Sequence, residues 1–152
     1  MALVAIQMDP IDKIDLHGDS SLMLALETQR RGHELFHYLP SSLSLKDGKV
    51  IARGHPLTVR YEAGNHFTMG EERLIDLTEA AVVLMRQDPP FDMSYITATH
   101  ILEHIHPKTL VVNDPVEVRN APEKLFVTHF DNVMPPTLIT HDRERIQAFR
   151  AE

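Results

Sequence analysis

Short hydrophobic runs alternate with amphipathic stretches along the first 121 residues of this chain. Ala2–Met8 is apolar except for Gln7, a pattern typical of a strand that is buried on both faces of a sheet. Asp9-Pro10 ends the run because proline has no backbone N–H to donate to a neighbouring strand. The chain therefore begins with a predicted interior strand of a parallel sheet.

The next segment predicts a helix and a second strand. Asp19 is a candidate N-cap ahead of apolar residues at helical spacing, and Gly32 suits the position after the last helical turn. Glu34–Leu39 then has the composition of a buried strand. A strand, a helix and a strand in this order form a crossover unit, which is right-handed in nearly all proteins.

The middle of the chain predicts antiparallel pairing. Leu43–Ala52 alternates between apolar and polar residues around Asp47-Gly48, which is a strong signal for a hairpin turn. We expect a separate short strand over Leu57–Tyr61 and a loop over Glu62–Glu72, where no period is visible.

Parallel strands and helices resume after the hairpin. The sequence predicts a strand over Ala81–Arg86, a helix that begins at Asp92 or Ser94, and a strand over Leu110–Asn113. Asp114-Pro115 then opens a short helix, with proline at its first position. Together these elements predict an α/β domain with a parallel sheet and a β-hairpin insertion.

A different pattern follows Ala121-Pro122. We expect a helix over Glu123–Phe130, a strand over Thr137–Ile139 and another helix over Arg143–Arg150. The change places a domain boundary near residue 121, with a first domain of residues 1–121 and a second of residues 122–152.

Composition excludes several classes of protein. The 152 residues carry 15 Lys and Arg against 22 Asp and Glu, a net charge of −7, so the chain lacks the basic character of a nucleic-acid-binding protein. It contains no cysteine, and its longest apolar runs, such as Ala80–Met85, are too short to cross a bilayer. We therefore expect a cytoplasmic protein with no nucleic-acid or membrane partner, which binds small molecules or other proteins.

Three segments follow predicted parallel strands, where ligands bind in open α/β sheets. They are Asp9–Ser21, Arg86–Asp92 and Asn113–Asn120. Arg86 is the best single candidate because a guanidinium binds a carboxylate through two hydrogen bonds. The alternative is an ordinary ion pair of Arg86 with Asp88 or Asp92. Ser20 and Ser21 could donate to an anion at a helix N-terminus, although simple capping is the favoured interpretation from the sequence.

Histidine is frequent, at 10 of 152 residues. His100 and His104 have the spacing of two metal ligands on one face of a helix, but no acidic residue completes an H-E-x-x-H pattern. His33 and His37 have the same spacing on a predicted strand. Solvent-exposed histidines are the favoured interpretation, and a metal site at His100 and His104 is the alternative. Glycine-rich phosphate loops and the G-x-S-x-G nucleophile motif are absent.

Six segments occur in a characteristic order: Met8–Pro10, Asp19–Ser21, Glu27–Gly32, Leu84–Asp92, Val112–Pro115 and Arg119–Phe126. Together they resemble the amino-terminal part of bacterial glutathione synthetases, members of the ATP-grasp superfamily. The Asp-Pro-Pro-Phe-Asp and Glu-Lys-Leu-Phe runs are the most specific. The resemblance implies a Rossmann-like pre-ATP-grasp domain over residues 1–121, followed by the first elements of an ATP-grasp domain over residues 122–152.

Such enzymes join γ-glutamylcysteine to glycine with ATP and magnesium. ATP phosphorylates the cysteinyl carboxylate, and the glycine amine attacks the acyl phosphate. By position, the resemblance implies substrate contacts at Ser20, Arg86 and Asp88, and a contact of Lys124 with the nucleotide phosphates. From the residues alone, Lys124 is a solvated helix lysine. We also expect the chain to form a homo-oligomer through its apolar residues after Pro122.

Two departures from the family pattern qualify these expectations. Gln87 stands where relatives commonly carry lysine, and the chain has about half the family's length. The glycine-rich phosphate cover, the second ATP lysine and the metal ligands are missing from it, so we predict no catalytic or metal-binding residue and no activity for this chain alone. The alternative function is a stand-alone α/β binding or regulatory module. A receiver-like module needs an aspartate after its central strand, where this chain has Arg86.

Overall fold

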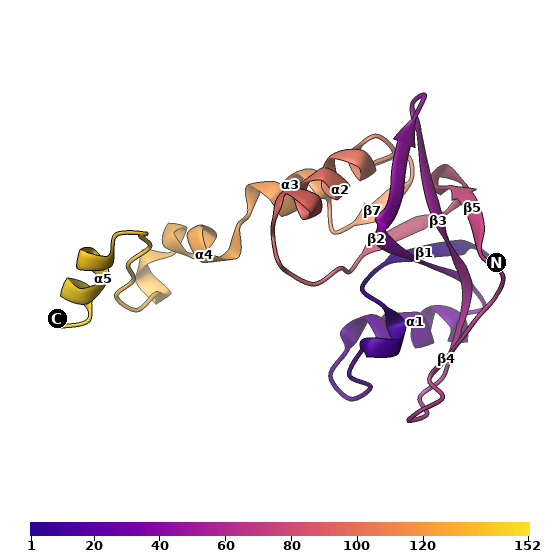
Figure 1. Ribbon diagram of the computed structural model, residues 1–152, viewed down its shortest axis with the longest axis horizontal. Coiled ribbons are helices and arrows are strands. Elements are labelled where there is room, and N and C mark those ends of the chain that lie inside the picture. The colour runs from indigo at the N-terminus through magenta and orange to yellow at the C-terminus, as the bar shows by residue number, and fades with distance from the viewer.

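The computed structural model describes residues 1–152, apart from the side chain of Glu123. Within these residues seven strands form one sheet in the order β4-β3-β2-β1-β6-β7, and β5 also pairs with β3 (Figure 1). The strands are β1 (Leu3–Gln7), β2 (Glu34–Lys46), β3 (Lys49–Val59), β4 (Phe67–Met69), β5 (Arg73–Asp76), β6 (Val82–Met85) and β7 (Leu110–Val112). The helices are α1 (Ser20–Arg30), α2 (Met93–Glu103), α3 (Pro115–Asn120), α4 (Glu123–Phe126) and α5 (Arg143–Phe149).

Helices α1 and α2 cover opposite faces of the sheet. Leu22 of α1 shares one hydrophobic core with Ile6 of β1, whereas Leu102 of α2 shares the other core with Ala5. Neighbouring residues of β1 enter different cores because successive side chains of a strand point to opposite faces. This double burial explains the continuous apolar run at the start of the chain.

The centre of the sheet is parallel. β1 pairs with β2 on one side and with β6 on the other, and β6 pairs with β7, all in parallel. The predicted strands at Ala2–Met8, Ala81–Arg86 and Leu110–Asn113 are therefore confirmed, as is the α/β class. The loops that follow β1 and β6 leave the sheet at the same edge.

The outer part of the sheet is antiparallel, so the sheet is mixed and the prediction of a parallel sheet was incomplete. β2 continues to Lys46, and β3 returns along it from Lys49. The turn between them consists of Asp47 and Gly48, whose φ angles are 52° and 78°. Glycine and aspartate tolerate this left-handed conformation better than most residues, as the hairpin prediction required.

Two predictions for the segment after the hairpin were wrong. Leu57 belongs to the long strand β3 and does not begin a separate strand, and Phe67–Met69 forms β4 where a loop was expected. Gly54 lets β3 run close to β2, since a Cβ atom at this position would lie 2.8 Å from Cβ of Tyr38. The extent of these strands depends more on pairing with a neighbouring strand than on the alternation of apolar and polar residues in their own sequence.

A C-terminal arm of residues 122–152 extends away from the sheet beyond α3 (Figure 1). The helix predicted over Glu123–Phe130 is shorter, because α4 is followed by a separate 3-10 turn at Val127–His129. The helix predicted over Arg143–Arg150 is confirmed by α5. Thr137–Ile139 is not a strand, since no described strand pairs with it.

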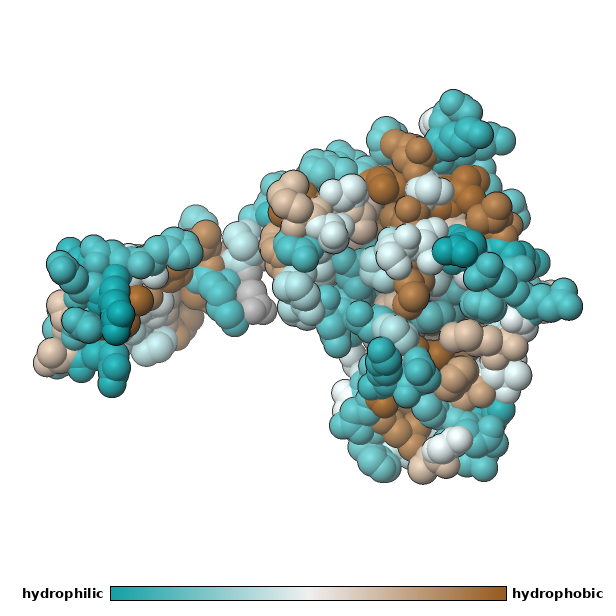
Figure 2. All heavy atoms as spheres, viewed as in Figure 1, coloured by the Kyte–Doolittle hydropathy of each residue, from teal (hydrophilic) through white to brown (hydrophobic). Residues whose placement is uncertain are grey.

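Large apolar side chains are exposed on the arm, where Figure 2 shows brown surface among hydrophilic residues. They include Leu125, Phe126 and Phe130, which are 53%, 45% and 51% exposed. In the described part of the chain, none of the helices has the length and apolar character needed to traverse a bilayer.

Candidate functional site

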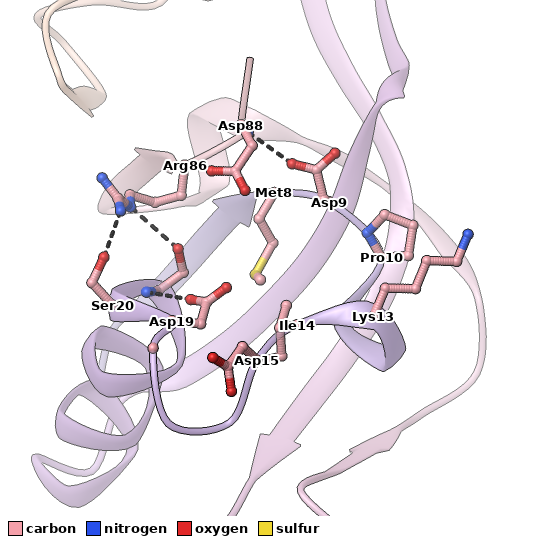
Figure 3. Close-up of a pocket in the computed structure, with 12 residues that line it drawn as sticks. Met8, Asp9, Pro10, Lys13, Ile14, Asp15, Asp19, Ser20, Arg86 and Asp88 are labelled. Atoms are coloured by element: carbon pink, nitrogen blue, oxygen red, sulfur yellow. Dashed lines mark hydrogen bonds between the residues drawn. The ribbon is translucent and has the colours of Figure 1, made fainter. Parts of the chain in front are cut away.

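A pocket of about 350 Å³ opens at the edge of the sheet where the loops after β1 and β6 diverge (Figure 3). From β1 the chain passes through α1 to one neighbouring strand, and from β6 it passes through α2 on the opposite face. The connections therefore separate between β1 and β6, which is the switch point where open α/β sheets bind ligands. The pocket is lined by Met8, Asp9, Pro10, Lys13, Ile14, Asp15, Gly18, Asp19, Ser20, Ser21, Arg86 and Asp88.

Asp19 fixes the start of α1 at this pocket. Its carboxylate accepts hydrogen bonds from the backbone N–H groups of Ser21, at 2.6 Å, and Leu22, at 3.0 Å. An aspartate N-cap satisfies donors that the first helical turn leaves unpaired, so the local sequence is sufficient to begin the helix here. The cap places Ser20 and Ser21 in the lining of the pocket.

Arg86 lies beyond the end of β6 and reaches across to α1. Its backbone N–H donates to the carbonyl of Gln7 at 2.7 Å, which extends the parallel pairing by one residue. Its side chain donates from Nη2 to Oγ of Ser20 at 2.7 Å and from Nε to Oγ of Ser21 at 3.3 Å (Figure 3). The structure thus brings together the three side chains that the sequence singled out at separate positions.

The alternative ion pair of Arg86 does not occur. Among the ion pairs of the described residues, none joins Arg86 to Asp88 or Asp92. Asp92 instead caps α2, where it accepts a hydrogen bond from the backbone N–H of Tyr95 at 3.0 Å. The half-buried guanidinium of Arg86 therefore has hydroxyl partners and no carboxylate partner among these pairs.

This arrangement leaves donors that can serve a ligand. The hydroxyls of Ser20 and Ser21 accept from Arg86, so each keeps its own O–H to donate. A guanidinium has five N–H bonds, of which the two serines occupy two. Together these groups can bind a carboxylate at the N-terminus of α1, where the helix dipole also favours negative charge.

The same pocket also carries negative charge. Four aspartates line it: Asp9, Asp15, Asp19 and Asp88. The side chain of Asp9 accepts a hydrogen bond from the backbone N–H of Asp88 at 2.7 Å and so joins the two loops directly. Figure 3 shows the carboxylate of Asp88 on the pocket side of this bond, near Arg86. The pocket lining therefore contains both cationic groups and carboxylates, which suits a ligand that carries both a carboxylate and an ammonium group.

A hydrogen bond between β1 and the loop after β6 was not predicted. Gln7 is fully buried in β1, and its side-chain amide donates to Oε1 of Gln87. The signal in the sequence was Gln7 itself, the one polar residue within the first apolar run. The side chain of Gln87 therefore joins the loop that begins at Arg86 to β1.

Tyr95 of α2 borders this loop. Its ring lies 5.0 Å from that of Phe91, between ring centroids. Burial raises the pKa of Tyr95, the charge of Arg86 opposes this, and the charge of Asp88 adds to it. The tyrosine therefore stays a neutral hydroxyl beside the charged groups.

The remaining predicted segments lie elsewhere. Asp114 caps α3 by accepting from Val116 N–H at 2.8 Å, and it lies 3.1 Å from Nε2 of His106. Its segment therefore does not line the pocket, although it follows a parallel strand. Lys124 is on α4 in the C-terminal arm and is likewise not among the lining residues.

The histidine pairs do not form a metal centre in the described part of the chain. No group of three or more His, Asp or Glu side chains there is placed to hold a metal ion. His100 is 60% exposed, with Nδ1 3.7 Å from a Glu103 oxygen that also binds Arg119. The expectation of a solvent-exposed histidine was wrong for His37, which is buried in β2 with its Nε2 3.3 Å from the carbonyl of Asp9.

These features are those of the α/β domains with helices on both faces of the sheet, a class in which ligands generally bind at the switch point. Residues 2–119 match the family model described as prokaryotic glutathione synthetase, N-terminal domain. The chain belongs to this family.

Curated relatives agree with this assignment. The chain is 61% identical over 149 residues to a glutathione synthetase of Mesorhizobium japonicum, a match that covers 98% of the chain and 48% of the relative. It is 59% identical over 153 residues to the glutathione synthetase of Brucella melitensis, covering 100% of the chain and 49% of the relative. The glutathione synthetase of Vibrio parahaemolyticus is 40% identical over 153 residues, with 100% and 48% covered. The chain thus spans about half the length of these relatives.

Proposed function

We propose that this chain is the substrate-binding, amino-terminal half of a cytoplasmic glutathione synthetase. The complete enzyme joins γ-glutamylcysteine to glycine through an acyl phosphate, and ATP supplies the phosphoryl group with magnesium. The family of the chain supports this proposal. The observation that carries it in the structure is the contact of Arg86 with Ser20 at the switch-point pocket.

In this proposal Arg86 and Ser20 bind a carboxylate of the dipeptide. γ-Glutamylcysteine carries an α-ammonium and an α-carboxylate at its glutamyl end, and the pocket lining contains charged groups that can bind each of them. Asp88, two residues beyond Arg86 on the same loop, binds the ammonium group. Binding of both charged groups fixes the orientation of the glutamyl end, and orientation is a large part of catalysis when two substrates must meet.

In this proposal ATP binds outside the switch-point pocket. We propose that residues 122–152 begin an ATP-grasp domain and that Lys124 contacts the phosphates. Phosphoryl transfer depends on several cationic groups and on metal ions around the phosphates. The sequence has no glycine-rich phosphate loop, and no metal-binding group occurs among the described residues. We therefore expect no turnover from this chain alone, as measured by ADP release with ATP, magnesium and both amino substrates.

Calorimetric titration with γ-glutamylcysteine tests the role of the pocket. Arg86→Ala removes a charged hydrogen-bond donor, so we expect the dissociation constant to rise on the order of 30-fold or more. Arg31→Ala is the matched control, because Arg31 is an exposed arginine of the same domain that pairs with Glu27 away from the pocket. Equal affinity of the wild-type chain and Arg86→Ala would reject the proposed site.

A further inference from the structure

One wall of the pocket is a loop, Pro10–Asp19, and a distant turn lies against it. That turn, Arg60–His66, connects β3 to β4. It is closed by the backbone N–H of Arg60, which donates to the carbonyl of His66 at 2.9 Å. Gly64 has a φ of 76°, a conformation that glycine adopts without strain. The turn is therefore an ordered element.

Two side-chain contacts join the turn to the pocket wall. His66 Nε2 lies 2.7 Å from the carbonyl oxygen of Ile11, and His17 Nδ1 lies 2.9 Å from the hydroxyl of Tyr61. The rings of His17 and Tyr61 also meet edge to face, with centroids 5.9 Å apart. A carbonyl only accepts, so His66 must carry its proton on Nε2 and donate it to Ile11.

The other hydrogen bonds of the loop are local. The N–H of Lys13 donates to the carbonyl of Pro10, and the N–H groups of His17 and Gly18 donate to Asp15. Among the hydrogen bonds described for residues 10–18, only those of the two histidines reach a distant segment. The side chain of Ile11 is buried, but Lys13, Asp15 and Gly18, which line the pocket, are exposed.

We infer that His66 and Tyr61 are positioning residues for the substrate pocket, acting through Ile11 and His17. Neither lines the pocket, so their effect on a ligand is indirect. They raise the fraction of molecules in which the wall is correctly placed, and apparent affinity scales with that fraction. The role in substrate binding rests on the proposed function, whereas the ordering of the wall does not.

Hydrogen exchange measures the wall directly, at the backbone amides of Lys13, His17 and Gly18. In His66→Phe, which keeps a ring but loses the donor, we expect these amides to exchange about fivefold faster, the effect of one net hydrogen bond. His66→Gln restores an N–H donor at a similar reach and should return the rates toward wild type. Unchanged rates in His66→Phe would overturn the inference.

His55→Phe is the matched control. His55 also contacts a backbone carbonyl, that of Gly70 at 3.0 Å, and it does not line the pocket. Its substitution should leave exchange of the Pro10–Asp19 loop unchanged. If His55→Phe accelerates exchange there as much as His66→Phe does, the effect is a general loosening of the sheet and the inference fails.

The same variants then test the link to substrate. We expect the dissociation constant of γ-glutamylcysteine to rise about fivefold in His66→Phe, less in Tyr61→Phe, and little in His66→Gln. Wild-type chain that does not bind the dipeptide would defeat the proposed function, while the exchange data still decide the ordering of the wall. Wild-type binding that His66→Phe leaves unaltered would defeat the positioning role alone.

Discussion

Arg86 donates a hydrogen bond from Nη2 to Oγ of Ser20 over 2.7 Å, although 66 positions separate the two residues. Arg86 follows β6 and Ser20 begins α1, and these two elements are not consecutive in the sequence. This hydrogen bond joins the end of a strand to the start of a helix at the edge of the pocket. The site therefore depends on the capping of α1 as much as on the arginine.

Removal of the α1 cap should weaken both the fold and the pocket. Asp19→Ala leaves the backbone N–H groups of Ser21 and Leu22 without their acceptor. We expect the free energy of unfolding to fall by about 1 kcal/mol in urea titrations, and the affinity for γ-glutamylcysteine to fall with it.

Asp142→Ala is the control for this prediction. Asp142 caps α5 in the same way, by accepting from the N–H of Glu144 at 2.9 Å, but α5 has no buried residue. Its loss should leave the urea midpoint of the domain unchanged. A midpoint that shifts equally in both variants would contradict the special position of Asp19.

Asp88 should recognise the ammonium group of the dipeptide. Asp88→Asn removes the charge but not the shape, so we expect roughly tenfold weaker binding of γ-glutamylcysteine, about 1.4 kcal/mol. N-Glutarylcysteine lacks the amino group, and its binding should be insensitive to the substitution. Asp12→Asn serves as control, because Asp12 is an exposed aspartate that does not line the pocket. Equal losses for both ligands would exclude this role of Asp88.

His37 should make stability depend on pH. Burial lowers the pKa of His37, and the charge of His55 lowers it further, while the Asp9 carbonyl and Asp12 oppose the shift. The unfolded chain, where histidine has a pKa of about 6.5, therefore binds the proton more readily than the folded chain. The stability contributed by neutral His37 is present above that value and is lost as pH falls below it. Each unit of pKa difference contributes about 1.4 kcal/mol.

Urea titrations at pH 7.5 and pH 5.0 measure this effect. Wild type should lose more free energy of unfolding between the two pH values than His37→Gln, which cannot titrate at this position. The comparison cancels the pH-dependent contributions of the other nine histidines, since the sequence contains ten. Equal losses in the two proteins would show that His37 does not contribute.

The exposed apolar residues of the C-terminal arm should cause self-association of the chain. Leu125, Phe126 and Phe130 are each close to half exposed, and apolar patches of this kind favour pairing. We expect light scattering to show a mass that rises with concentration, and Phe126→Ser/Phe130→Ser to reduce that rise. Met93→Ser, at an exposed methionine of α2, is the control. A monomer at all concentrations would contradict this prediction.

Helix starts in this protein could be predicted from neighbouring residues alone. Asp19, Asp92 and Asp114 each accept hydrogen bonds from backbone N–H groups two or three positions ahead. Capping of this kind involves only one turn of chain, so local sequence contains all the information it needs. The same holds for the Asp47-Gly48 turn.

The extent of the antiparallel strands could not be predicted in this way. β3 passes through Gly54 and Pro56, residues that weaken a strand when it is judged by its own composition. It is continuous because β2 pairs with it on one side and β4 and β5 on the other. The stabilising hydrogen bonds come from segments distant in the sequence.

The sequence by itself determined the parallel strands, the caps and the candidates Ser20, Arg86 and Asp88. Only the tertiary structure decided that Arg86 donates to the two serines, that Asp9 accepts from the backbone of Asp88, and that Gln87 accepts from Gln7. The physical reason is the separation in sequence between the residues that interact. Caps and strand periods depend on adjacent residues, whereas contacts between residues 65 to 80 positions apart depend on the placement of β6 beside β1. That order is decided by burial of both faces of the whole sheet.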